Sequence, residues 1–108
     1  MNILLLQTNI EWQDPDTNRC RAEEMILSAP KADIVVLPEM FQTGFNTHPE
    51  ECAENAEGAT FAWMQTVAAR KDAAICGSVI INDAGKYFNR LYFVKPDGTY
   101  AKYDKRHL

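Results

Sequence analysis

Apolar residues along this chain follow two different periods, which separate predicted strands from predicted helices. Several short runs are apolar with little interruption, and some are rich in β-branched side chains, as is typical of buried strands. Strong turn signals follow two of them, Asp83-Ala84-Gly85-Lys86 and Pro96-Asp97-Gly98-Thr99. The pattern therefore predicts strands over residues 2–8, 33–37, 73–82, 87–95 and 100–103.

Two other segments have apolar residues spaced by three and four positions, which predicts amphipathic helices. In the first, Asp16 or Thr17 is a suitable N-cap and Pro30 ends the helix. In the second, Thr60 is the expected N-cap. The predicted inward faces are Ala22, Met25, Ile26 and Ala29 in the first helix, and Phe61, Met64, Val67 and Ala68 in the second.

The order strand, helix, strand favours a right-handed crossover between parallel strands. Residues 40–58 are polar and predicted to form a long loop, which in a compact domain is usually functional or mobile. The later strands are close enough in sequence to form hairpins. We therefore expect one layered domain of the α/β or α+β class over residues 1–108.

Composition argues against several classes of function. With 108 residues, 46% of them hydrophobic, the chain can form a packed core, and a net charge of −4 argues against nucleic-acid binding. No apolar run approaches the ~20 residues of a membrane-spanning helix. The three cysteines form no Cys-x-x-Cys pair, and His48 and His107 are isolated. We expect a reduced, cytoplasmic protein without a metal site or a membrane partner.

Two positions are candidates for chemistry. Glu39 directly follows a predicted buried strand, where α/β sheets collect ligand-binding groups, and apolar neighbours would raise its pKa toward that of a general base. Lys105 likewise follows the last predicted strand. If the two converge, they form a carboxylate–ammonium pair in which the amine can stabilise an oxyanion. The alternatives are a solvated loop glutamate and a solvated basic segment, and spacing alone leaves them open.

Several segments together resemble one known family. They are Leu37-Pro38-Glu39-Met40-Phe41, Thr43-Gly44-Phe45, Cys76-Gly77-Ser78-Val79, Asn89-Arg90 and Tyr103-Asp104-Lys105-Arg106-His107-Leu108. In this order and at similar spacing they resemble the carbon–nitrogen hydrolase, or nitrilase, superfamily, and most closely its omega-amidase branch. That branch hydrolyses the side-chain amide of 2-oxo acids such as 2-oxoglutaramate. The resemblance covers the whole chain.

The resemblance implies a Glu–Lys–Cys triad. Glu39 matches the general base and Lys105 the oxyanion-stabilising lysine, whereas the nucleophilic cysteine lies beyond the Tyr-Asp-Lys-Arg-His-Leu segment and is absent from this chain. Cys20, Cys52 and Cys76 do not match that position. The chain alone is therefore expected to be inactive, and no cofactor is required.

The resemblance also implies a four-layer αββα sandwich of which these residues are the N-terminal part, so the domain is expected to be truncated before its nucleophile. The intact protein is expected to form a homodimer or larger oligomer. Phe41 and Phe45 would line the substrate entrance or pack beneath a loop. Arg90 would hold a substrate carboxylate or support the site from behind.

A non-enzymatic alternative remains, in which the chain is a complete small α/β module that binds a partner through an exposed strand edge. A nucleotide-binding domain is less favoured, because no glycine-rich phosphate loop follows a predicted strand.

Overall fold

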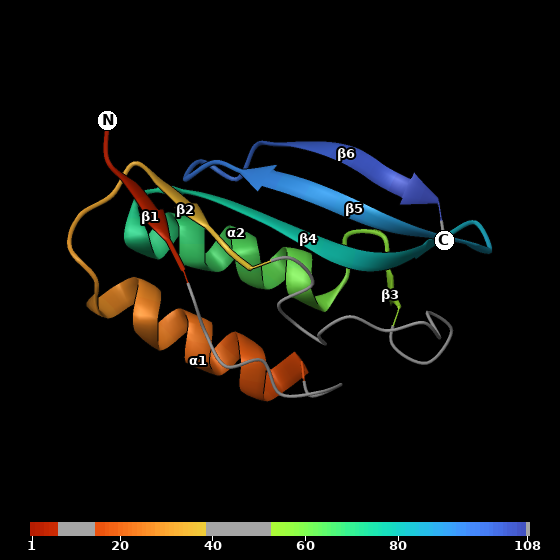
Figure 1. Ribbon diagram of the computed structural model, residues 1–108, viewed down its shortest axis with the longest axis horizontal. Helices are drawn as coiled ribbons and strands as arrows, with labels where there is room; N and C mark the ends of the chain where they lie inside the picture. Colours follow the sequence, from red (N-terminus) through yellow and green to blue (C-terminus); the bar gives the residue numbers. More distant parts are fainter. Residues whose placement is uncertain (7–14, 39–52, 108) are drawn as a thin grey trace.

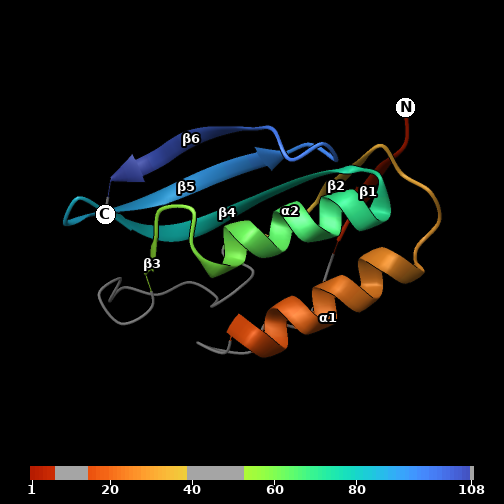
Figure 2. The same ribbon diagram turned by 180° about the vertical axis from the view of Figure 1, so that it is seen from behind.

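The computed structural model describes residues 1–6, 15–38 and 53–107, in which strands form one mixed sheet and two helices cover one of its faces. Figures 1 and 2 show both helices on the same side of the sheet. The predicted α/β class is confirmed. In chain order the elements are β1 (Ile3–Leu5), α1 (Pro15–Ser28), β2 (Ile34–Val36), β3 (Glu54–Asn55), α2 (Ala59–Lys71), β4 (Ala74–Asp83), β5 (Lys86–Val94) and β6 (Tyr100–His107).

The first half of the sheet is parallel, as predicted. β1 pairs with β2 and β2 with β4, with Val35 of β2 opposite Ile75 of β4. The two helices make the crossovers between these strands. β3 also pairs in parallel with β4, further along it, and lies inside residues 40–58, for which the sequence predicts a loop. Its two polar residues carry no strand pattern, so only the pairing with β4 defines it.

The second half is antiparallel and consists of β4, β5 and β6. Both predicted turns are present, since Asp83 pairs with Lys86 and the N–H of Lys95 donates to the carbonyl of Thr99 at 2.8 Å. β6 continues to His107, four residues past its predicted end. The charged residues there lack a strand pattern, but backbone pairing with β5 extends the strand.

The helices match their predicted positions, whereas their predicted caps are wrong. α1 begins at Pro15, so Asp16 and Thr17 lie inside it. α2 begins at Ala59 after Gly58, which has no side chain to cap it, and Thr60 is already helical. The carboxylate of Glu54 instead accepts the backbone N–H of Thr60 at 2.7 Å. The carboxylate of Glu54 in β3 therefore caps α2 in place of a side chain at the N-cap position.

The core lies between the sheet and the helices. All four inward residues predicted for α2 are buried, but of those predicted for α1 only Ala22 and Ile26 are, and Met25 is 40% exposed. The sheet contributes alternate residues to this core, including Val35, Ile75, Val79 and Tyr92. Neither helix in the described ranges is long and apolar enough to cross a membrane.

We call the other side of the sheet the open face; among the described residues no helix packs against it. Alternation along the strands places on it Ile3 and Leu5 of β1, Cys76 of β4 and Tyr103 of β6. Ile3, Leu5 and Tyr103 are 58%, 70% and 67% exposed. Within the described residues, this side of the sheet therefore carries exposed apolar side chains.

Candidate functional site

The end of β2 leads toward the predicted general base. The backbone N–H of Leu37 donates to the carbonyl of Cys76 at 2.8 Å, which extends the pairing of β2 with β4 by one residue. Gly77 allows this close approach, because a Cβ there would lie 2.9 Å from Cδ1 of Leu37. Glu39, Phe41 and Phe45 lie outside the described residues.

Lys105, the predicted oxyanion donor, lies at an irregularity of β6. Arg90 of β5 pairs with Asp104, whereas the preceding residue Asn89 pairs with Arg106. Lys105 is thus the extra residue of a β-bulge, a feature that bends a strand and redirects a side chain. Its side chain is exposed.

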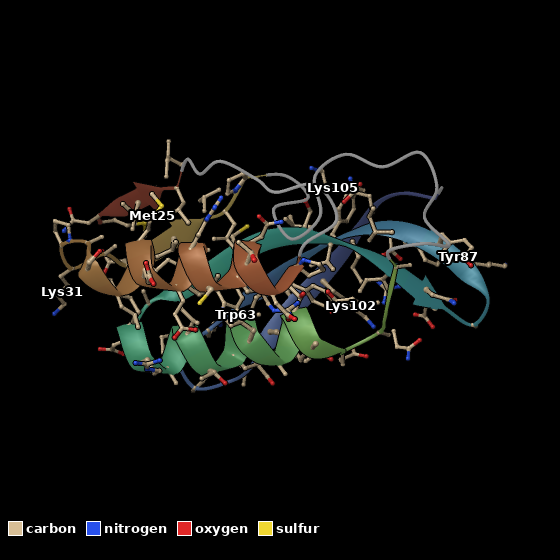
Figure 3. All side chains as sticks on the ribbon, turned by 90° about the horizontal axis from the view of Figure 1, so that it is seen from below. Met25, Lys31, Trp63, Tyr87, Lys102 and Lys105 are labelled. Atoms are coloured by element: carbon tan, nitrogen blue, oxygen red, sulfur yellow. The ribbon has the colours of Figure 1, made fainter. Side chains whose placement is uncertain are left out.

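Lys105 acts electrostatically on Cys76. Burial raises the pKa of the Cys76 thiol, and the positive charge of Lys105 partly opposes this rise in pKa. Figure 3 shows Lys105 on the side of the molecule away from α2, which is the side of the open face, and its charge acts on the sheet region where Cys76 pairs with Val36 of β2. Figure 3 shows Lys102, by contrast, toward the α2 side of the molecule.

Arg90 lies in β5 and is almost fully buried, with 4% of its side chain exposed. Its Nε donates to Oδ1 of Asp104 at 2.6 Å and its Nη2 to Oδ2 of the same residue at 3.2 Å. Nη2 also donates to Asp83 at 3.0 Å. The guanidinium lies 5.4 Å from the centre of the Phe88 ring. These partners are protein groups on the helix side of the sheet, because Arg90 pairs with the core residue Val79.

The structure thus brings Lys105 and Arg90 onto neighbouring strands but directs them to opposite faces. The carboxylate partners of Arg90 were not identified from the sequence. A signal was present, because counting outward from the Pro96–Thr99 turn places Asp104 directly opposite Arg90. Opposite charges in such a cross-strand pair attract each other.

The described cysteines are a poor match for a nucleophile or a metal site. Cys20 is exposed on α1 and Cys76 is partly buried in β4. Within residues 1–6, 15–38 and 53–107, no three His, Cys, Asp or Glu side chains gather as metal ligands would. Cys52 lies outside the described residues.

Comparison with curated proteins identifies relatives across the whole chain. An omega-amidase of Yersinia enterocolitica is 40% identical over 110 residues, which cover 100% of this chain and 42% of that protein. A 2-oxoglutaramate amidase of Bacillus subtilis is 31% identical and is matched over 98% of this chain and 42% of its own length. The chain therefore spans about two fifths of these relatives.

A solved structure shows the same fold. It is a carbon–nitrogen hydrolase superfamily protein of Xanthomonas campestris with an arsenic adduct in its active site. Its sequence is 42% identical to this chain and the TM-score is 0.92. The match covers 100% of this chain and 41% of the Xanthomonas protein. Residues 3–108 match the sequence model of the carbon-nitrogen hydrolase family. The sequence motifs, the fold and these matches agree, and the chain belongs to the carbon–nitrogen hydrolase family.

Proposed function

We propose that the protein carrying this chain is an omega-amidase, which hydrolyses the side-chain amide of a small 2-oxo acid such as 2-oxoglutaramate and releases ammonia. The 40% identity to an omega-amidase over the whole chain carries this proposal. Membership of the carbon–nitrogen hydrolase family supports amide hydrolysis as the reaction. Residues 1–108 would then be the N-terminal part of one longer domain.

In the proposed mechanism Glu39, Lys105 and a cysteine outside this chain act together. Glu39 takes the proton of the thiol, and the thiolate attacks the amide carbon. Lys105 and a backbone N–H stabilise the tetrahedral oxyanion. Glu39 then protonates the departing ammonia, which leaves a thioester, and next activates the water that hydrolyses it. These steps need no metal or organic cofactor.

The described geometry supports the pairing of Glu39 with Lys105. The charge of Lys105 acts on Cys76, and Cys76 pairs with Val36, three residues before Glu39. The chain thus leaves β2 in the region of the sheet that the amine approaches. Phe41 and Phe45 follow this position and would border the substrate.

The proposal is tested by measuring ammonia release from 2-oxoglutaramate by the full-length protein. Glu39→Gln should lower kcat by ~10²–10⁴, because it removes the base. Lys105→Gln should lower it by ~10²–10³, because it removes an oxyanion donor. Lys102→Gln on the same strand is the matched control and should retain activity. Near-normal turnover by Glu39→Gln would show that Glu39 is not the general base. If the wild-type protein hydrolyses only amides unrelated to 2-oxo acids, the omega-amidase branch is excluded.

The chain of residues 1–108 alone should release no ammonia, because the nucleophile is missing. A cytoplasmic location and assembly into a homodimer or larger oligomer stay predictions from the sequence.

A further inference from the structure

The bulge in β6 interrupts the regular pairing with β5, so side-chain contacts are needed to fix its conformation. A bulge disrupts the ladder of backbone hydrogen bonds locally and adds one residue to one of the two paired strands. Lys105 occupies that extra position, between Asp104, which pairs with Arg90, and Arg106, which pairs with Asn89. The direction of its side chain therefore depends on how firmly the neighbouring residues are held.

Asp104 is held from the helix side of the sheet. Two hydrogen bonds from Arg90, at 2.6 and 3.2 Å, fix both carboxylate oxygens, and this forked geometry restrains orientation as well as distance. Arg90 is restrained in turn by Asp83, at the end of β4, and by the ring of Phe88. The buried guanidinium thus ties β6 to β5 and β4 at the residue that precedes Lys105.

We propose that Arg90 is a positioning residue: by clamping Asp104 it fixes the bulge and directs Lys105 onto the open face. The catalytic meaning of this inference rests on the proposed function. Arg90 itself does not reach the substrate side, because it and Lys105 lie on opposite faces of the sheet.

The thiol of Cys76 reports the position of Lys105 independently of activity. In the full-length protein, the pH dependence of alkylation at Cys76, followed by peptide mass spectrometry, gives the pKa of this thiol. Lys105→Gln should raise this pKa, since the lysine charge lowers it. Lys102→Gln should leave it unchanged, since Lys102 pairs with Glu57 on the other face.

Two variants of the clamp separate displacement of Lys105 from a direct change in charge. Arg90→Lys keeps the positive charge but loses the fork, so a raised Cys76 pKa comes from displacement of Lys105. Asp104→Ala removes a negative charge, which by itself lowers the Cys76 pKa, so a rise again reports displacement. Both variants should shift alkylation in the direction of Lys105→Gln.

Activity provides the second readout. If Arg90 positions Lys105, Arg90→Lys and Asp104→Ala should lower kcat by ~10–100-fold with little change in KM, as is found for residues that orient a functional group. Circular dichroism and thermal melting show which variants are folded. If Arg90→Lys does not fold, Asp104→Ala tests the same clamp, because its carboxylate is partly exposed.

The proposal is overturned if folded variants keep the wild-type alkylation profile, whatever happens to kcat. If the profile shifts but the wild-type protein hydrolyses no 2-oxo acid amide, the proposed function fails while the positioning role of Arg90 stands.

Discussion

At the scale of single residues, the turn between β4 and β5 contains a conformational strain that can be relieved. Ala84 and Gly85 have φ values of 54° and 81°. A two-residue hairpin turn with both φ angles positive favours Asn-Gly, because alanine has a Cβ that disfavours the left-handed region. Ala84→Asn should raise the free energy of unfolding by ~0.5–1 kcal/mol, measured by urea denaturation. Ala84→Val, with its β-branched side chain, should lower it; the same sign for both variants would contradict this account.

The Arg90–Asp104 pair makes stability depend on pH. The guanidinium of Arg90 lowers the pKa of the Asp104 carboxyl. The folded state thus holds this proton less tightly than the unfolded state, whose aspartate pKa is about 3.9. The stabilisation is present above about pH 4 and is lost as the pH falls through the lower folded-state pKa. The difference in unfolding free energy between wild type and Asp104→Asn should therefore shrink as the pH falls below about 4. A pH-independent difference would contradict the role of this charge.

The candidate site shows what residue patterns could and could not predict. The motifs identified Glu39, Lys105 and Arg90 as residues of interest. For Arg90 they left two roles open, because a motif does not show on which face of the sheet a side chain lies, and the cross-strand pairing with Asp104 follows only from counting outward from the Pro96–Thr99 turn. The bulge at Lys105 has no sequence signal, since it arises from a one-residue difference in how β5 and β6 pair.

At the scale of elements, the N-terminus of α2 depends on Glu54. Its carboxylate accepts the N–H and the hydroxyl of Thr60, and that hydroxyl also accepts Nη1 of Arg19 from α1 at 2.9 Å. Glu54→Ala should lower the free energy of unfolding by ~1 kcal/mol, in the range of a lost N-cap. Glu24→Ala, at an exposed position of α1, is the control and should have a much smaller effect. Equal effects in denaturant titrations would show that Glu54 is not a cap.

The elements were predictable where a local rule decides them. Helix α2 has a full apolar stripe, and Pro15 and Pro30 bracket α1. The cap of α2 was not predictable, because the capping carboxylate comes from β3, a two-residue strand that exists only through its pairing with β4. The sequence pattern also underestimated the length of β6, because backbone pairing with β5, and not an apolar pattern, extends this strand to His107.

At the scale of the whole molecule, the open face predicts self-association of the 108-residue chain. Ile3, Leu5 and Tyr103 are large, exposed and on the same side of the sheet. An apolar face of this kind favours association with other molecules. Sedimentation of the purified 108-residue chain should therefore show oligomers at micromolar concentration.

Leu5→Ser combined with Tyr103→Ser should reduce this association. Met25→Ser is the matched control, because Met25 is an exposed apolar residue of α1 and not of the sheet. A monomeric chain with one cooperative unfolding transition would instead favour the alternative of a complete small interaction module.

The sequence alone determined the order of the elements, the parallel and antiparallel halves of the sheet, the family and the two motif residues Glu39 and Lys105. These depend on apolar periodicity, turn residues and short motifs, which are local properties of the chain. Only the tertiary structure decided that Arg90 binds Asp104 and Asp83, that Lys105 occupies a bulge and that Glu54 caps α2. Each of these depends on strand register and on contacts between distant segments, because the face on which a side chain lies is set by pairing.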